Sequence, residues 1–567
     1  MDSTPLPPAG YLGTSNGAAP STPRLRRARR KGGQLPLPAP STNGHLTISQ
    51  LETWLWDAAC AIRGAQDAPK FKDFILPLLF YKRLSDVFDD RLAEQVTTFG
   101  DADLARDIVE QDHLAALRDG RPPMIGVYLR SAYRWDALRN HPADGTLGQF
   151  VTEAMRRVTE VNPALDGVLN VKDFNETQSG QRTLDDDRLA SLIEVLSSHR
   201  LGLADTEADI LGRAYEYLLR KFAEGQGQSA GEFYTPKEVA HLMAELIEVP
   251  PYATVYDPTC GSGGLLIQAR MGFERQHPDQ RTAAPRLYGQ ELNATTNAMA
   301  KMNMFLHGYE DAIIAIGDTF TTPQFATEST GLRTFDRVVA NPMWNQKNYS
   351  DTFYQNDRWG RFQTYGVPPE SSADWGWVQH IAASLKDGGR ACVVLDTGAA
   401  SRGSGGQNQN RERTIREKMV EADLIEGVVL LPENLFYNTT APGILLVLSR
   451  GKPTDRRGQL IVLNASAYFV KRKPKNELTQ QGIAATAAVF RAWETQPKLS
   501  RIVPVDELRS TDYNLSPSQF VAVDEAAANR PLASIISELR QARLARERAD
   551  AVLNDFILKL ALEVPPP

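Results

Sequence analysis

Between residues 235 and 450 the chain alternates short apolar runs with segments of helical periodicity, and this alternation limits the possible fold more than any other feature. Short apolar runs bounded by glycine, proline or acidic residues are typical of buried strands. Strands that alternate with helices form a mostly parallel sheet with helices on both faces. The sequence therefore predicts a doubly wound α/β domain, which binds its ligands beyond the carboxyl ends of the strands.

The first predicted strand, Thr254–Tyr256, runs into Asp257 and a glycine-rich turn that precedes a helical segment. Glycines in such a turn let a ligand approach the backbone closely. The turn lacks the G-x-G-x-x-G pattern, and a carboxylate here repels the phosphates of a dinucleotide but attracts a cation. We therefore predict S-adenosylmethionine as the cofactor, because it carries a sulfonium and an α-ammonium group. Its predicted contacts in this unit are Asp257, Gly261, Ser262, Gly263 and Gly264.

Two further predicted strands, within residues 286–291 and 312–318, also end in acidic residues. Glu291 ends the first and is placed to accept hydrogen bonds from ribose hydroxyls. Asp318 ends the second and is placed for the adenine edge of the cofactor. Either acid alone could equally be a helix N-cap. Acids at successive strand ends, followed by Asn-Pro, favour a cofactor site.

A fourth predicted strand, Phe335–Ala340, ends at the tetrapeptide Asn341-Pro342-Met343-Trp344. Asn341 supplies a side-chain carbonyl, Pro342 leaves its own carbonyl free, and Trp344 offers a stacking face. Two acceptors and an aromatic plate suit a planar amine. We therefore predict Asn341, Pro342 and Trp344 as the catalytic residues. For the tetrapeptide alone, an ordinary turn with a packed tryptophan is the alternative.

These motifs together resemble the amino-methyltransferases of DNA. The stretch Gly231–Lys237 narrows the resemblance to the modification subunit of Type I restriction-modification systems, and the run Ala61–Asp86 is similar to the helical leader of that family. The resemblance covers residues 48 to 450 well. One departure is Met343, because the family's tetrapeptide is usually Asn-Pro-Pro-aromatic.

The resemblance implies methylation of adenine N6 in a base that is flipped out of duplex DNA. It places the methionine end of the cofactor against Glu232, Phe233, Tyr234, Thr235, Pro236 and Lys237. Thr235 and Pro236 also have the pattern of a helix start, with threonine as N-cap. The partners implied are double-stranded DNA and a specificity subunit that serves two modification subunits, with a restriction or motor subunit as a further candidate. No G-x-x-x-x-G-K-[ST] motif is present, so any motor would belong to another chain.

Three alternatives remain for the function. Cytosine-N4 methylation uses the same geometry, although its tetrapeptide usually opens with serine. Methyltransferases for RNA or for protein glutamine also use Asn-Pro-Pro-aromatic but lack the long helical leader. A degenerate scaffold that binds DNA and partners without catalysis is compatible with Met343.

The length of 567 residues predicts two or three domains. Residues 1–44 are rich in proline and small polar residues, with a basic run at 24–31, and we expect a disordered tail. Residues 45–225 are predicted as a helical domain, 226–470 as the catalytic domain, and 471–567 as a C-terminal region that ends in a partner-binding helix. That helix is predicted from an apolar stripe formed by Ile535, Leu539, Ala542, Ala549, Leu553, Phe556 and Leu560.

The net charge of −6 means that any affinity for DNA must come from a local basic patch or from a partner. The segment 345–370 interleaves aromatic residues with Lys347, Arg358 and Arg361, which suits either base stacking and phosphate contact or an ordinary surface loop. Residues 401–410 have the composition of a mobile lid. With three dispersed cysteines, eight scattered histidines and no membrane-length apolar run, we expect a cytoplasmic protein without disulfides or metal.

Overall fold

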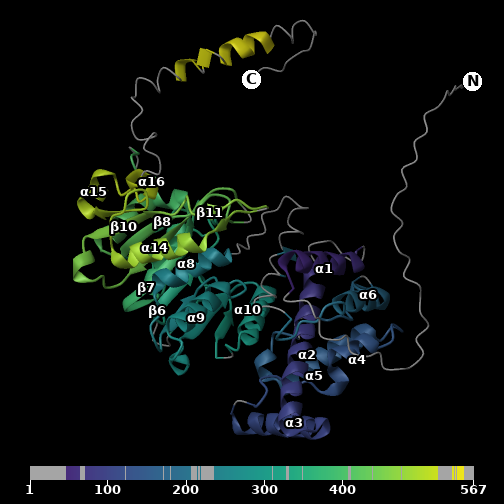
Figure 1. The fold of residues 1–567 in the computed structure, drawn as a ribbon. Coiled ribbons are helices and arrows are strands. Elements are labelled where there is room, and N and C mark those ends of the chain that lie inside the picture. Colours follow the sequence, from purple (N-terminus) through teal and green to yellow (C-terminus); the bar gives the residue numbers. More distant parts are fainter. Residues whose placement is uncertain are drawn as a thin grey trace, which may run out of the picture. The chain divides into compact units, whose positions relative to one another are not determined.

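The computed structural model describes most of the chain beyond residue 45 (Figure 1). The described residues are 46–63, 71–121, 123–169, 172–178, 180–205, 214, 217–218, 235–309, 311–326, 331–347, 349–406, 410–436, 439–473, 475–521, 539–541, 543–544 and 546–553. The predicted tail 1–44 lies outside these residues, as do the predicted cofactor contacts Glu232, Phe233 and Tyr234.

The N-terminal part of the described chain is helical, as predicted. Its helices are α1 (Ile48–Ala61), α2 (Phe71–Phe99), α3 (Ala102–Asp119), α4 (Trp135–Asn140), α5 (Leu147–Val161) and α6 (Asp186–Leu196), with a small hairpin of β1 (Thr177–Gln178) and β2 (Gln181–Arg182). Helix α1 opens with a capping box, because the Thr47 side chain accepts from the Gln50 N–H and the Gln50 side chain accepts from the Thr47 N–H. Its apolar face, with Leu51, Trp54 and Leu55, is buried in the helical core.

The second half of the chain is organised by one nine-stranded sheet. Its strands are β3 (Thr254–Asp257), β4 (Arg286–Glu291), β5 (Ile313–Ile316), β6 (Phe335–Ala340), β7 (Leu385–Asp396), β8 (Ile425–Leu430), β9 (Gly443–Ser449), β10 (Gln459–Asn464) and β13 (Ser500–Pro504). Their spatial order is β13-β10-β8-β9-β7-β6-β3-β4-β5. Strand β9 is antiparallel to β7 and β8, and β13 is antiparallel to β10. The other neighbours are parallel, so the carboxyl ends of β3 to β8 and of β10 share one edge.

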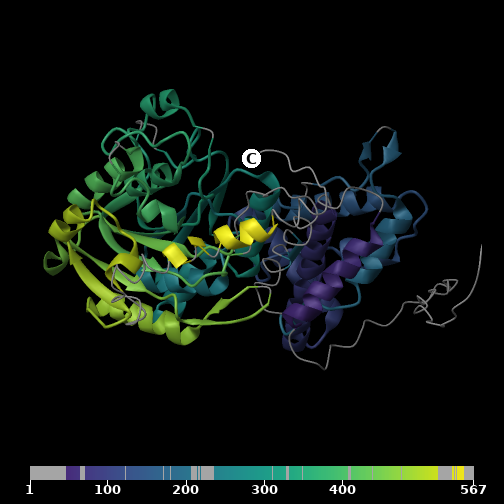
Figure 2. The ribbon, with the colours of Figure 1, turned by 90° about the horizontal axis from the view of Figure 1, so that it is seen from above.

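Helices cover both faces of this sheet (Figures 1 and 2). One face packs against α8 (Lys237–Ile247), α9 (Gly264–Gln276), α10 (Ala294–Leu306) and α14 (Gln480–Ala492). The other packs against α12 (Asp374–Ala383), α13 (Arg411–Glu421), α15 (Val505–Ser510) and α16 (Pro517–Phe520). Along β7 the side chains alternate between the faces, with Cys392 and Val394 in one core and Ala391 and Val393 in the other. The doubly wound α/β fold is confirmed.

The sheet extends further along the chain than residue 470, the predicted end of the catalytic domain. Strand β13 follows α14 and pairs with β10, so the segment up to Pro504 completes the sheet. A separate hairpin of β11 (Phe469–Val470) and β12 (Glu477–Leu478) lies between β10 and α14, and a short helix, α11 (Asp351–Gln355), follows the tetrapeptide. Within the described ranges, no helix combines the length and the apolar character that crossing a membrane requires.

The described residues of the C-terminal stripe are helical and exposed. Leu539 is 65% exposed and Leu553 is 57% exposed. Ile535, Ala542, Phe556 and Leu560 lie outside the described residues. The partner-binding role of this segment stays a prediction.

Candidate functional site

The site lies where the strand order of the sheet reverses. From β3 the chain moves outward to β4 and then to β5, and it returns to place β6 on the other side of β3. The parallel pairing of Tyr256 with Val338 brings the carboxyl ends of β3 and β6 together. Such a reversal opens a crevice beyond the strand ends, where α/β sheets bind ligands. Asp257 ends β3, and Asn341 directly follows β6.

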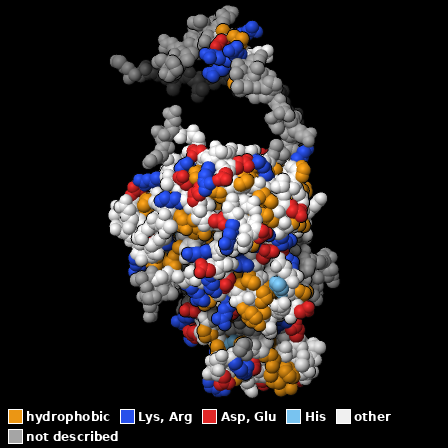
Figure 3. All heavy atoms as spheres, turned by 90° about the vertical axis from the view of Figure 1, so that its left-hand side faces the viewer, with side chains coloured by type: hydrophobic (Ala, Val, Ile, Leu, Met, Phe, Trp, Pro, Cys, Tyr) orange, Lys and Arg blue, Asp and Glu red, His pale blue; other side chains and the backbone are white. Residues whose placement is uncertain are grey.

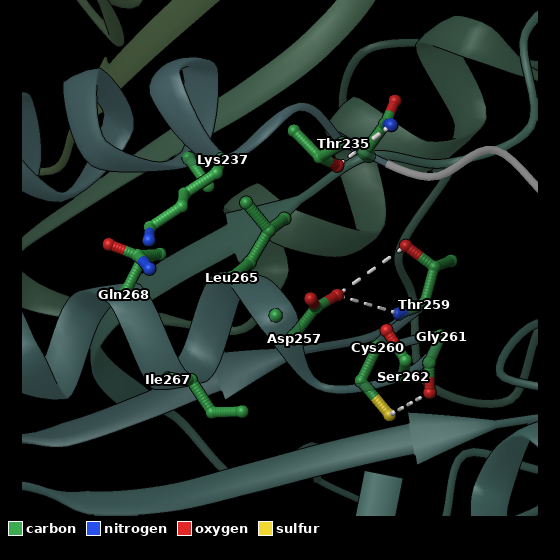
Figure 4. A pocket seen from close by; sticks show the side chains of 13 residues that line it. Thr235, Lys237, Asp257, Thr259, Cys260, Gly261, Ser262, Leu265, Ile267 and Gln268 are labelled. Carbon is green, nitrogen blue, oxygen red and sulfur yellow. Dashed lines mark hydrogen bonds between the residues drawn. The ribbon is translucent and has the colours of Figure 1, made fainter. Parts of the chain in front are cut away.

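One pocket occupies this crevice (Figure 4). Its lining residues come from the segment before α8, the glycine turn after β3, the start of α9 and the end of β6. They are Thr235, Lys237, Ala240, Asp257, Thr259, Cys260, Gly261, Ser262, Gly264, Leu265, Ile267, Gln268 and Asn341. Predicted cofactor contacts from two distant stretches therefore line the same pocket as the predicted catalytic Asn341. Pro236, Gly263, Glu291, Asp318, Pro342 and Trp344 are not part of this lining.

Asp257 dominates the electrostatics of the pocket. Its side chain is buried, with 1% of the residue exposed. One carboxylate oxygen accepts from the Thr259 N–H at 2.9 Å, and the other, Oδ2, has no hydrogen-bond partner among the described residues. Burial raises the pKa of this carboxyl to about 8, and the charge of Glu291 adds to the rise. A buried acceptor without a partner costs free energy, so the pocket fits a ligand that carries a positive N–H donor.

The glycine turn wraps closely around the adjoining helices. Gly263 caps α9 with φ +83°, and a Cβ added there would lie 2.6 Å from the Met304 Cε atom of α10. A Cβ added at Gly264 would meet nothing within 4 Å, so the backbone there is open on its pocket side. The Gly261 N–H donates to Glu291 Oε2 at 3.1 Å. The acid at the end of β4 therefore holds the turn, and its predicted contact with ribose remains a prediction.

Hydrogen bonds hold the loop that contains Asp318 in place. Its carboxylate accepts from the Phe320 N–H at 2.8 Å. The Thr319 hydroxyl donates to the Pro258 carbonyl at 2.6 Å, which joins this loop to the glycine turn. Arg361 donates to the carbonyl oxygens of Thr319 at 3.1 Å and Phe320 at 2.6 Å.

The position of Arg361 contradicts one interpretation of segment 345–370. Arg361 is only 2% exposed and forms a forked ion pair with Asp357, so this guanidinium is an interior brace rather than a contact for DNA phosphates. Tyr354 is also buried, in an aromatic cluster with Phe320 and Trp377. Arg358, in contrast, is exposed. The sequence pattern could not separate these roles, because both arginines stand in the same polar and aromatic segment.

The tetrapeptide forms a compact corner beside the pocket. The Asn341 Nδ2 atom donates to the Thr235 hydroxyl at 2.9 Å, and its Oδ1 atom accepts from the Trp344 indole N–H at 3.3 Å. Trp344 is partly buried, and its ring lies edge-on to Phe436 with the centroids 4.9 Å apart. Met343 is 37% exposed. The roles predicted for Asn341, Pro342 and Trp344 remain predictions, and of these three residues only Asn341 lines the Asp257 pocket.

Thr235 differs from its predicted role as a helix cap. Helix α8 begins at Lys237 with Pro236 as its N-cap, and no side chain caps it. The Thr235 hydroxyl instead accepts the hydrogen bond from Asn341. Because the two residues are 106 positions apart in the chain, local sequence rules favoured the cap.

A network of acids beyond the tetrapeptide was missed from the sequence. Asn345 has φ +53°, and its backbone N–H donates to Asp374 at 2.8 Å while its side chain donates to Asp396 at 3.3 Å. Arg402 pairs with both acids and with Glu412. Asp396 ends β7, and this further strand-end acid was the available signal.

The described residues of the predicted mobile lid make several contacts with the rest of the domain, and the mobility of this segment stays a prediction. Besides the Arg402 ion pairs, the Gly405 N–H donates to Asp512 at 2.7 Å, and the Ser404 hydroxyl donates to the Asp512 carbonyl at 2.9 Å. Among the described residues, there is no group of three or more histidine, cysteine or acidic side chains that could hold a metal ion.

Comparisons with known families give two matches that together span most of the chain. Residues 206–529 match the model of N-6 DNA Methylase. Residues 51–196 match the model of the HsdM N-terminal domain. The first match contains the whole pocket and the tetrapeptide.

Individual proteins agree with these matches. The Type I restriction enzyme MjaVIII methylase subunit of Methanocaldococcus jannaschii is 34% identical over 479 residues, which cover 82% of this chain and 78% of the relative. The MpnII methylase subunit of Mycoplasma pneumoniae is 27% identical and covers 83% of this chain and 89% of its own. A crystal structure of a type I restriction-modification methyltransferase subunit from Streptococcus thermophilus superposes with a TM-score of 0.67 at 29% identity, over 83% of this chain and 99% of that chain.

Proposed function

Because the chain belongs to the N-6 DNA methylase family, as a methylase subunit of the Type I restriction-modification kind, we propose that it moves a methyl group from S-adenosylmethionine to the N6 amine of an adenine extruded from duplex DNA. The observation that carries this proposal is a single pocket that joins Asp257 to Asn341. The first residue suits a cationic cofactor, and the second suits an amine. A reaction between two such ligands uses both residues.

Residues of the pocket fit the cofactor. Asp257 would hold the α-ammonium group, since its Oδ2 atom lacks a partner among the described residues. Lys237 lines the same pocket and suits the carboxylate of the methionine moiety. Gly264 leaves room for close approach to the backbone, and Glu291 and Asp318 are assigned to ribose and adenine. When bound, the cofactor supplies an electrophilic methyl group.

The tetrapeptide supplies position and polarity to the amine. The lone pair of adenine N6 is conjugated with the ring, so the amine is a poor nucleophile. Acceptance of its two hydrogens by the Asn341 side-chain oxygen and the Pro342 carbonyl draws the nitrogen towards tetrahedral geometry and aims its lone pair. Methylation makes the nitrogen cationic and therefore acidic, so it releases one proton to water and no strong base is required. Catalysis rests on orientation and on fixed dipoles.

In this proposal, Trp344 stacks against the extruded base. A base inside a duplex cannot present its amine to the pocket, so it is rotated out of the stack, and an aromatic ring that contacts its face stabilises that state. Trp344 packs against Phe436, which fixes the plane of the indole. Met343 replaces the usual second proline, and because it contributes neither acceptor, both contacts to the amine are retained.

We assign target recognition, and any motor or nuclease activity, to partner chains. Target choice is assigned to a separate specificity subunit, with two methylase subunits for each, and any motor or nuclease to a further chain. Support comes from the relatives, which are named as subunits of Type I restriction enzymes, and from the lack of a Walker-type motif in the sequence.

The test is substitution of Asn341. In Asn341→Ala, transfer of labelled methyl groups to target DNA should fall by about two to three orders of magnitude, the usual cost of removing one polar group that acts in the transition state. Affinity for S-adenosylmethionine, measured by calorimetry, should persist. Asn341→Asp is the matched control, because it keeps an acceptor oxygen and should retain part of the activity.

Product analysis separates the remaining alternatives. N6-methyladenine in the treated DNA supports the proposal, whereas N4-methylcytosine would show that the site methylates the N4 amine of cytosine instead. Wild-type rates in Asn341→Ala would remove the tetrapeptide from the mechanism. A wild-type chain that does not bind the cofactor would identify a scaffold.

A further inference from the structure

The hairpin of β11 and β12 carries a run of cations at its turn. Phe469 pairs with Leu478, and Val470 pairs with Glu477. Residues 471–476 connect the two strands, and Lys471, Arg472 and Lys473 among them are all exposed. Three successive basic side chains at an exposed turn form what we call the basic tip.

The topology of the sheet places the basic tip on the catalytic edge. Strand β10 is parallel to β8, and both end at the edge where β3 and β6 end. Because β11 starts at Phe469, shortly after β10 ends at Asn464, the hairpin extends from this same edge (Figure 1). The basic tip and the tetrapeptide thus lie at the same edge of the sheet, where the parallel strands end.

Hydrogen bonds fix the base of the hairpin to the loop that follows β8. The Lys475 ammonium donates to the Asn434 side chain at 3.1 Å and to the Thr439 carbonyl at 2.9 Å. The Asn476 backbone N–H donates to the Asn434 carbonyl at 2.9 Å, and its side chain donates to the Glu433 carbonyl at 3.0 Å. These contacts anchor the hairpin at both its backbone and its side chains.

That loop also supports the stacking residue. Phe436 belongs to it, is buried, and contacts Trp344 with ring centroids 4.9 Å apart. An unbroken series of contacts therefore runs from the hairpin through this loop to the tetrapeptide. The basic tip is held on the same support as the corner that receives the target base.

The charge at the tip is not cancelled by its surroundings. Arg472 pairs with Glu477 across the hairpin at 2.8 Å. Lys471 and Lys473 form no ion pair with any residue that the structure describes. The whole chain carries a net charge of −6, and on the face drawn in Figure 3 acidic and basic side chains are intermixed. Two unpaired lysines at the catalytic edge supply the local basic patch that an acidic chain needs to hold DNA.

We propose that the basic tip, Lys471 to Lys473, binds backbone phosphates of the duplex beside the extruded base. This inference rests on the proposed function, because it assigns a surface to the DNA substrate of the same site. Lysine ammonium groups act as point charges on phosphates and read no base, so the tip contributes affinity and register but no target choice.

The test removes the two unpaired charges. Full-length Lys471→Gln/Lys473→Gln, assembled with its specificity subunit, should bind target duplex more weakly. The slope of log affinity against log salt should become shallower by about 0.9 for each phosphate that is no longer neutralised. The KM for DNA should rise, while kcat at saturating DNA, affinity for S-adenosylmethionine and the set of methylated sites should stay unchanged.

A matched variant removes the same charge from the opposite edge of the sheet. Arg286→Gln/Arg457→Gln should leave the salt slope unchanged, since both residues are exposed near the amino ends of β4 and β10. An unchanged slope in the lysine variant would overturn the proposal. Loss of the specificity subunit during purification of that variant would also overturn it, and would assign the tip to a protein partner. Failure of the wild type to methylate DNA would instead count against the proposed function.

Discussion

Cofactor binding should release a proton from Asp257. Burial raises the pKa of this carboxyl to about 8, so at pH 7 about nine-tenths of it is protonated in the free protein. A cationic partner in direct contact lowers a carboxyl pKa by about one to three units. If S-adenosylmethionine lowers it by about two, only about one-tenth stays protonated, and about 0.8 of a proton leaves on binding.

The same shift sets the pH dependence of affinity. Between pH 6 and pH 7 the free carboxyl stays mostly protonated while the bound one ionises, so the affinity should rise by about fivefold. The comparison is confined to this range because the α-amino group of the ligand itself titrates near pH 8. The sign is opposite for folding. The unfolded chain loses this proton first, so the contribution of Asp257 to stability falls as pH rises from about 4 to about 8.

Isothermal titration calorimetry in buffers of different ionisation enthalpy measures both quantities. The binding heat should fall linearly as the ionisation enthalpy of the buffer rises, with a slope whose magnitude equals the number of protons released. Asp257→Asn should bind weakly, release no proton and flatten the fall in unfolding free energy with pH. Buffer-independent heats together with constant affinity from pH 6 to 7 would refute the assignment of Asp257 to the cationic end of the cofactor.

Two further pairs of substitutions test the residues that hold the site in place. Arg361→Met should lower the free energy of unfolding by about 3–5 kcal/mol in urea titrations, because it leaves the buried Asp357 carboxylate unpaired. Arg509→Met removes the exposed pair with Glu421 and should cost at most about 1 kcal/mol, so equal losses in the two variants would contradict the brace. Asn345→Gly should keep most methyl-transfer activity, since glycine adopts φ +53° without strain, whereas Asn345→Val should lose it through misplacement of the adjoining Trp344. Comparable rates for the glycine and valine variants would show that this backbone conformation does not matter.

The sequence contained enough information for the strands that build the pocket. The predicted runs ending at Asp257, Glu291 and Ala340 agree with β3, β4 and β6, because burial on both faces and polar residues at strand ends are local signals. The capping box at Thr47 is local in the same sense and is confirmed.

Features that depend on distant partners could not be predicted in this way. The Thr235 hydroxyl had a plausible local role as a cap, and only the fold brings Asn341 to it. Arg361 sits among polar residues in the chain, yet the carbonyls of Thr319 and Phe320 draw it into the interior. Strand β13 lies beyond a helix and a weak pattern, so its membership of the sheet is decided by pairing with β10.

The hydrogen bond from the Trp344 indole to Asn341 Oδ1 has a consequence for how the protein tells one base from another. An amide oxygen has two lone pairs, and in the free protein the indole N–H uses only one of them. Under the proposed function, the amine of the target base would use the other, and the indole contact would keep the Asn341 oxygen oriented for it. Thymine presents a carbonyl where adenine presents its amine, so it would offer no hydrogen to this oxygen. The oriented amide would thereby disfavour bases that have no amine to methylate.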